Sequence, residues 1–296
     1  TSDANVVLNE CAGVFQYAQT CFEGLKAYET VDGRVVVFRP DLNAQRMADS
    51  ARRLEMPAFP EDRFIEAVRE TVKANIDFVP PYGSEATLYL RPYMIASSPV
   101  IGVKPADEYQ FRIFGTPVGP YFTGGIKPLT LKVSDFDRAA PHGTGNVKAG
   151  LNYAMSLHAI VTAHEEGYDE NLYLDPQTRT FVEETGGANF LFVTKDGTVV
   201  TPKSDSILPS ITRRSLGLKV EERQIRLDEI HEFAECGLCG TAAVISPVGK
   251  VVDHGKEIVF GSDSENPGPV CMKLRETLLD IQLGKIEAPE GWIYEI

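Results

Sequence analysis

A lysine framed by small residues is the most chemically suggestive group in the sequence. Lys148 lies in the segment Gly143-Thr-Gly-Asn-Val-Lys-Ala-Gly150, where few neighbouring side chains would keep a planar molecule away from its amine. A lysine amine bonds covalently to a carbonyl group when its surroundings lower its pKa enough to leave some of the amine neutral. The alternative is a solvated loop lysine, which is the usual state of this side chain, and the glycines alone do not decide between the two.

Two adjacent carboxylates follow about 35 residues later. Glu183 and Glu184 end an apolar segment and directly precede Thr-Gly-Gly-Ala-Asn. In a functional site, one of them would pair with a protonated ring nitrogen and keep an aromatic heterocycle able to accept electrons from a substrate carbanion. In a purely structural role, both would be solvated charges in a turn.

Two further segments have the composition of backbone anion sites. Pro209-Ser-Ile-Thr212 indicates a helix start, where free N–H groups and the helix dipole favour a phosphate. Cys239-Gly-Thr-Ala-Ala-Val244 indicates a tight turn of small residues whose N–H groups would face an anion. Either segment would serve equally well as an ordinary cap or turn. Each of the four features is weak alone, but together and in this order they are specific.

An alternation of strands and helices must position these segments. In the first part, a strand at 33–38 follows an Asp-Gly turn, and Asp41 is expected to cap a helix whose apolar residues run from Ala44 to Leu54. A second helix, with Val68 in its apolar stripe, should end near Pro80. The remaining expected strands are at 87–91, 109–114, 129–133, 171–175, 190–193, 198–201 and 242–245, and the remaining expected helices are at 151–166, 227–235 and 270–283.

A segment rich in proline and glycine separates the two halves. The twelve residues 117–128 include three prolines and three glycines, which is typical of a connection between domains. We therefore expect a mixed α/β and α+β fold with a small N-terminal α/β domain at 1–118, an interdomain loop at 119–127 and a larger strand-rich domain at 128–296. A small-molecule site is expected in the cleft between them.

Composition and charge exclude several classes of protein. The 296 residues are 43% hydrophobic and 24% charged, which is too apolar for a disordered chain. No uncharged apolar run approaches the roughly 20 residues that a membrane helix needs. With 29 Lys and Arg against 42 Asp and Glu, the net charge of −13 argues against nucleic acid or an anionic membrane as partner.

The five cysteines predict neither a disulfide framework nor a metal site. They are few, odd in number and without a signal-like N-terminus, which favours a reducing cytoplasm. Cys236 and Cys239 form a C-x-x-C in an expected turn entering a strand, and no second ligand pair accompanies them. We interpret them as small buried hydrophobes.

Long stretches of the sequence resemble the branched-chain amino-acid aminotransferases, which are fold-type IV pyridoxal-phosphate enzymes. The resemblance extends over nearly the whole chain and rests on segments 17–28, 38–47, 88–92, 117–122 and 279–284. It implies a two-domain enzyme that holds pyridoxal 5'-phosphate at the cleft. It also implies a cytoplasmic homodimer that transfers the amino group of Leu, Ile or Val to 2-oxoglutarate, giving branched 2-oxo acids and L-glutamate.

The resemblance also implies roles for individual residues. Lys148 matches the lysine that binds the cofactor and moves the substrate proton, Tyr153 the tyrosine at its phenolic oxygen, and Glu184 the partner of its ring nitrogen. The residues that match the phosphate site are Arg46, Ile211, Thr212 and Thr241. The residues that match the substrate site are Tyr17, Phe22, Tyr89, Arg91, Tyr121, Thr241 and Ala242. Arg91 and Tyr17 would receive the second carboxylate of glutamate, while ordinary core packing is the alternative for the aromatic residues.

The sequence departs from the family in length at two places. After Leu216 the chain passes directly to Gly217, where the family has roughly two more helical turns of about 3.6 residues each. Part of the family's first strands also has no counterpart at the N-terminus. We interpret both differences as residues missing from this sequence.

Two other functions fit the same fold less well. D-amino-acid transamination or 4-amino-4-deoxychorismate lyase chemistry is disfavoured by Tyr17, Phe22 and the segment 89–91. A non-catalytic cofactor-binding relic is disfavoured because Lys148 and Glu184 occur together with the other matched cofactor residues.

Overall fold

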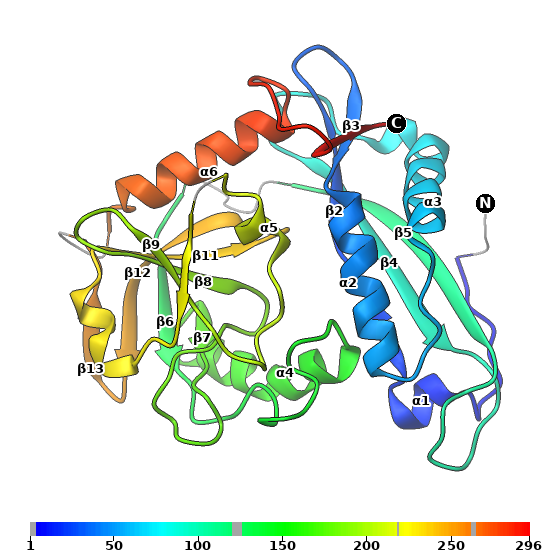
Figure 1. Cartoon of the computed structure of the whole chain (residues 1–296), viewed down its shortest axis with the longest axis horizontal. Coiled ribbons are helices and arrows are strands. Elements are labelled where there is room, and N and C mark those ends of the chain that lie inside the picture. The colour runs from blue at the N-terminus through cyan, green and yellow to red at the C-terminus, as the bar shows by residue number, and fades with distance from the viewer. Residues whose placement is uncertain (1–3, 120–125, 218, 262–264) are drawn as a thin grey trace. The chain divides into compact units, whose positions relative to one another are not determined.

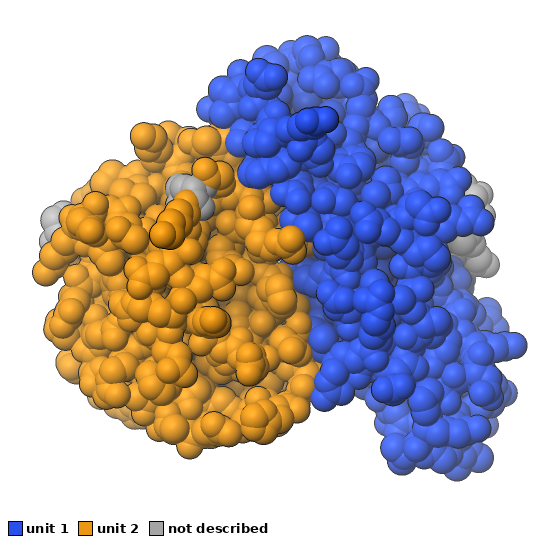
Figure 2. Space-filling view, in the orientation of Figure 1, with its two compact units in different colours: residues 1–120, 147–151, 280–296 blue, residues 121–146, 152–279 orange. Residues whose placement is uncertain are grey.

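The chain forms two compact units (Figures 1 and 2). The computed structural model describes residues 4–119, 126–217, 219–261 and 265–296. Unit 1 consists of 1–120, 147–151 and 280–296, and unit 2 of 121–146 and 152–279. Most of the expected interdomain loop, 120–125, lies outside the described residues.

This division differs from the expected domains at 1–118 and 128–296 in two segments. Residues 147–151 belong to unit 1 because Ala149 forms a β-bridge with Cys21. Residues 280–296 belong to unit 1 because the last strand, β14 (Ile293–Glu295), pairs with β3 (Val35–Phe38). Both contacts join residues that are far apart in sequence.

Unit 1 contains an antiparallel sheet covered by helices. Its strand order within the described residues is β1-β4-β2-β3-β14, and β5 pairs with β4. The other strands are β1 (Thr20–Phe22), β2 (Leu25–Glu29), β4 (Thr87–Ala96) and β5 (Tyr109–Val118). The helices are α1 (Gly13–Tyr17), α2 (Pro40–Arg53), α3 (Glu61–Ala74) and the 3₁₀ turn η1 (Ile76–Phe78).

Alternation along β4 separates the core from the opposite face of the sheet. Leu88, Leu90 and Met94 are buried in a cluster that includes residues of α2 and α3. Because successive strand residues point to opposite faces, Tyr89 and Arg91 lie together on the other face. The period of β4 therefore places two candidate substrate residues side by side.

Unit 2 contains a mixed sheet with the order β10-β9-β8-β11-β12-β6-β7, and β13 pairs with β12. Its strands are β6 (Leu129–Val133), β7 (Glu170–Leu172), β8 (Asn189–Val193), β9 (Val199–Pro202), β10 (Glu221–Arg223), β11 (Glu235–Gly240), β12 (Val244–Asp253) and β13 (Lys256–Val259). Its helical segments are α5 (Ile211–Arg214), η2 (Leu227–Glu232) and most of α4 (Gly150–Glu165) and α6 (Pro269–Gln282), whose residues 150–151 and 280–282 belong to unit 1. All five residues of β8 are buried, and this strand lies between β9 and β11 in the sheet.

Two expected helix features are wrong. The helix at Asp41 begins one residue earlier, at Pro40, because proline suits the first helical position and the preceding Arg39 has a left-handed φ of 49°. Asp41 pairs with Arg39 at 3.3 Å and is not the cap. The helix expected at 227–235 is only the 3₁₀ segment η2, and Glu235 already begins β11.

The cysteine pair lies inside β11 and not in a turn before it. Cys236 and Cys239 are both buried, and burial raises the pKa of Cys239 to about 11. Among the described residues, no group of His, Cys, Asp and Glu side chains is arranged to hold a metal ion. No described helix combines the length and apolar character needed to cross a membrane.

Candidate active site

The backbone of Lys148 is fixed on both sides within unit 1. Its carbonyl accepts a hydrogen bond from the N–H of Phe22 on β1 at 3.1 Å, and its own N–H donates to Ser50 Oγ on α2 at 2.9 Å. Its Nζ lies 4.9 Å from the centre of the Phe22 ring. The backbone of Lys148 is therefore held by a strand and a helix, while its side chain is partly exposed.

Arg91 lies between two aromatic rings. Its guanidinium carbon is 4.8 Å from the ring centre of Phe22 and 5.2 Å from that of Tyr89, both within cation–π range. One terminal nitrogen donates to the Tyr89 hydroxyl at 2.9 Å. Its buried Nε has no hydrogen-bond partner among the described residues. The structure thus brings Phe22, Tyr89, Arg91 and Lys148 together and leaves a donor of Arg91 for a carboxylate.

Tyr17, the other described residue of unit 1 that was predicted to bind substrate, is not connected to this group by a described contact. Tyr17 ends α1, and its hydroxyl donates to the carbonyl of Ile101. Tyr121 lies outside the described residues. Cys21, next to Phe22, is no candidate nucleophile, because burial and the charge of Glu23 raise its pKa to about 12.

Arg46 is held by a carboxylate that the sequence analysis did not single out. Its Nε and one terminal nitrogen lie 2.7 and 2.8 Å from the two carboxylate oxygens of Glu23, which is 0% exposed. Asn43 donates to the same carboxylate at 2.7 Å. This two-point pairing fixes the orientation of the guanidinium on α2.

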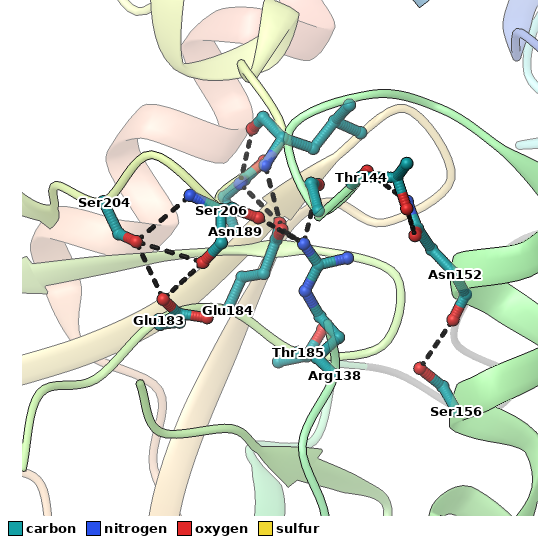
Figure 3. A network of polar contacts seen from close by, with 12 residues as sticks. Arg138, Thr144, Asn152, Ser156, Glu183, Glu184, Thr185, Asn189, Ser204 and Ser206 are labelled. Atoms are coloured by element: carbon teal, nitrogen blue, oxygen red, sulfur yellow. Dashed lines mark hydrogen bonds and ion pairs between the residues drawn. The ribbon is translucent and has the colours of Figure 1, made fainter. Parts of the chain in front are cut away.

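Glu184 is the centre of a buried polar network in unit 2 (Figure 3). It is 4% exposed, and its Oε1 accepts the N–H of Leu208 at 2.9 Å and lies 2.7 Å from a guanidinium nitrogen of Arg138. Its Oε2 accepts a hydrogen bond from the side-chain amide of Asn189 at 2.9 Å. These contacts fix the plane of the carboxylate.

Arg138, which the sequence analysis did not single out, contacts Glu184 in this network. It is 5% exposed, and the nitrogen that faces Glu184 also lies 2.7 Å from the carbonyl of Gly145 and close to the carbonyl of Ser206. A Cβ on Gly145 would lie 2.3 Å from the Ser206 carbonyl oxygen, so only glycine fits there. Arg138 therefore joins the glycine loop before Lys148 to the carboxylate of Glu184.

The neighbouring Glu183 has a different environment. It is 2% exposed, and its Oε1 accepts hydrogen bonds from the hydroxyls of Ser204, at 2.7 Å, and Ser206. Its Oε2 has no partner among the described residues. The interpretation of both glutamates as solvated turn charges is wrong, because the strands bury them.

The predicted phosphate and carboxylate segments adopt the expected local structures. Ile211 and Thr212 form the first turn of α5, whose N-cap Ser210 accepts the N–H of Arg213 at 3.2 Å. Thr241 and Ala242 form the turn between β11 and β12. Tyr153 lies on α4. These residues belong to unit 2 together with Glu184, whereas Lys148 and Arg46 belong to unit 1.

The whole chain is similar in sequence to known aminotransferases. The family model described as amino-transferase class IV matches residues 20–251. The chain is 49% identical to the branched-chain-amino-acid aminotransferase of Haemophilus influenzae, over 100% of this chain and 90% of that protein. It is 48% identical to the branched-chain-amino-acid aminotransferase of Helicobacter pylori, over 100% of this chain and 88% of that protein.

The fold is also similar to solved structures. The branched-chain aminotransferase of the thermophilic archaeon Thermoproteus uzoniensis with norvaline superposes with a TM-score of 0.83 at 28% identity, covering 98% of this chain and 94% of that one. A T.th. branched-chain amino acid aminotransferase with pyridoxamine 5'-phosphate superposes with a TM-score of 0.86 at 26% identity, covering 99% of this chain and 95% of that one. Other structures of the latter protein are complexes with N-(5'-phosphopyridoxyl)-L-glutamate and with 4-methylvaleric acid.

Proposed function

The chain belongs to the class IV aminotransferase family, and we propose from this premise that it is a branched-chain amino-acid aminotransferase. It transfers the amino group of leucine, isoleucine or valine to 2-oxoglutarate, with pyridoxal 5'-phosphate as cofactor, and gives branched 2-oxo acids and L-glutamate. The observation that carries this conclusion is the similarity, over nearly the whole chain, to enzymes of that name. The same similarity confirms the expected mixed α/β fold of the fold-type IV class.

The residues of the chain fit this cofactor. When bound, pyridoxal phosphate supplies an electron-accepting ring that stabilises negative charge at the substrate Cα. Lys148 would bind its carbonyl carbon and then carry the Cα proton, and Tyr153 would donate to its phenolic oxygen. Glu184, fixed by Arg138, would keep the proton on the ring nitrogen. The proposed phosphate ligands are the guanidinium of Arg46, the amides of Ile211 and Thr212, and Thr241.

The proposed substrate site must accept two kinds of side chain in turn. Phe22 and Tyr89 offer aromatic surface to an aliphatic side chain, and Arg91 between them keeps a buried Nε donor for the second carboxylate of glutamate. We place Tyr17 and Tyr121 at the same site from family resemblance. Thr241 and Ala242 would take the α-carboxylate through the β11–β12 turn.

The quaternary and cellular context is proposed on the same resemblance. We infer a cytoplasmic homodimer that binds the cofactor and takes small-molecule substrates as its ligands. The net charge of −13 disfavours a nucleic acid or an anionic membrane as partner. Light scattering in solution tests the dimer, and a monomeric mass would contradict it.

A steady-state panel tests the activity against its alternatives. The holoenzyme should form L-glutamate from L-Leu, L-Ile and L-Val with 2-oxoglutarate and should not release pyruvate from aminodeoxychorismate. Pyruvate release would favour the lyase, and inactivity with every substrate would favour the relic. Borohydride reduction followed by peptide mass mapping should locate the cofactor on Lys148, and an adduct at another lysine would refute the site assignment.

A further inference from the structure

The turn between β11 and β12 contains a strained residue. Val244 pairs with Gly240 across the hairpin and has a φ of +59°, in the left-handed region. The position after a three-residue hairpin loop usually carries glycine, because a side chain disfavours this conformation. For a β-branched residue it is a clear outlier. The Val244 side chain is also only 5% exposed, so the core holds it in place.

One arginine binds the backbone on both sides of Val244. A terminal nitrogen of Arg275 donates to the carbonyl of Ala243 at 2.6 Å and to that of Ile245 at 2.8 Å. Hydrogen bonds from a charged donor are stronger than neutral ones. Arg275 therefore stabilises a backbone conformation that Val244 itself disfavours.

Arg275 is positioned by α6, which is fixed to the same sheet (orange-red in Figure 1). The carboxylate of Glu235 on β11 accepts the N–H groups of Val270 and Cys271, in the first turn of α6, at 2.9 and 2.8 Å. One turn further along α6, Leu274 packs on a buried cluster that includes Cys239 of β11 and Ile245 of β12. The first two turns of the helix that carries Arg275 are thus held to the sheet.

We propose that Arg275 is a positioning residue that keeps the turn Thr241–Ala242 in the conformation that binds the substrate carboxylate. The inference rests on the proposed function, which assigns the α-carboxylate to this turn. Strained residues persist where the surrounding structure holds them, and they cluster at binding and catalytic sites. Without Arg275, Val244 would relax, and the N–H groups of the turn would rotate away from the carboxylate.

Steady-state kinetics of the holoenzyme test the role of Arg275. In Arg275→Met, KM for L-leucine and for 2-oxoglutarate should each rise about tenfold, because two charge-assisted hydrogen bonds to the turn are lost, while kcat changes less. Arg275→Lys keeps the positive charge but lacks the planar guanidinium group, so its KM values should lie between those of the wild type and Arg275→Met. Lys273→Met removes a charge from an exposed position of α6 and should leave both constants unchanged.

Relief of the strain gives a second test. Glycine adopts a positive φ freely, so Val244→Gly should make the turn less dependent on Arg275. In that background, Arg275→Met should raise KM by about threefold or less, a coupling that a double-mutant cycle measures. Equal effects of Arg275→Met in both backgrounds would overturn the inference.

Calorimetric titration with 4-methylvaleric acid separates this inference from the proposed function. If wild-type holoenzyme does not transaminate L-leucine but binds this acid more tightly than Arg275→Met does, the proposed function fails and the role of Arg275 stands. If Arg275→Met lowers only the melting temperature and leaves KM and the affinity for the acid unchanged, the inference fails and the function stands. If the wild type neither transaminates nor binds the acid, both fail.

Discussion

At the scale of single residues, the proposed partner of the cofactor's ring nitrogen is Glu184. Its carboxylate is buried and receives donors from Arg138, Asn189 and the backbone of Leu208. Glu184→Gln should lower kcat about 10²–10³-fold, the range found when one preorganised polar contact in an active site is lost, because an amide cannot hold the ring proton. Cofactor absorbance during dialysis should show that binding is largely retained.

The neighbouring glutamate provides the matched control for this prediction. Glu183 bonds to Ser204 and Ser206 and has no described contact with Arg138. Glu183→Gln should therefore reduce kcat much less than Glu184→Gln. A Glu184→Gln enzyme with the wild-type rate would mean that the ring-nitrogen partner is misassigned.

Arg138 should matter for stability as well as for orientation. Arg138→Met leaves the buried carboxylate of Glu184 without its cation, and removal of one partner of a buried pair costs about 3–5 kcal/mol. Urea unfolding of the cofactor-free protein measures this loss. Arg138→Lys keeps a positive charge and should lose less free energy of unfolding than Arg138→Met. This second variant keeps the test decisive if the methionine variant does not fold. A loss below about 1 kcal/mol in both variants would contradict the role of the pair.

An exposed histidine predicts one pH dependence. His254 contacts Asp253 at 2.7 Å and Asp135 at 2.9 Å, and these carboxylates raise its pKa above the usual 6.5. Its contribution to folding is thus fully present below pH 6.5 and is lost as pH rises through the raised value. Unfolding of wild type and His254→Gln should differ most in acid and converge at higher pH. A difference in unfolding free energy that grows as the pH rises would contradict this prediction.

A site residue can be predicted from the sequence when the features that mark it are its neighbours along the chain. Lys148 is recognisable because its small neighbours are adjacent in sequence. Arg138, Glu23 and Arg275 are not, because their roles come from burial and from partners that the fold brings from far along the chain. An arginine alone in a sequence is indistinguishable from a solvated one.

At the scale of elements, the N-terminus of helix α6 is capped by a side chain from a strand. Its first turn contains no acidic residue, and the carboxylate of Glu235 on β11 takes its free N–H groups. Glu235→Ala should lower the free energy of unfolding by about 1–3 kcal/mol, because it leaves buried donors unpaired. Glu276→Ala, at an exposed position of the same helix, is the control. Equal urea midpoints for the two variants would contradict the cap.

Elements are predictable from sequence where local pattern and tertiary pairing agree. The strand expected at 87–91 is the first half of β4, where apolar and polar residues alternate in the sequence. Its extension to Ala96 depends on pairing with β5. The helix expected at 227–235 does not reach its expected end because residues from Glu235 onward pair with β8 and β12. Strand pairing there outweighs helix propensity, which is a weak preference.

At the scale of the whole molecule, local composition predicts where the first unit's long segment ends. It does not predict which later segments return to that unit. Proline and glycine at 117–128 indicate where the first long segment ends. Nothing local predicts that 147–151 and 280–296 return to unit 1, since both depend on pairing with residues more than 100 positions away. The bulk charge of −13 is equally uninformative about the proposed site, to which Arg46 and Arg91 would contribute their guanidinium groups.

The function of the whole molecule is tested most directly by one comparison of substrates. Purified holoenzyme is incubated with 2-oxoglutarate and either L-leucine or D-alanine, and L- or D-glutamate formation is followed. We predict rapid formation of L-glutamate with L-leucine and none of either enantiomer with D-alanine. D-glutamate formed from D-alanine, with no reaction of L-leucine, would contradict the assignment as a branched-chain amino-acid aminotransferase.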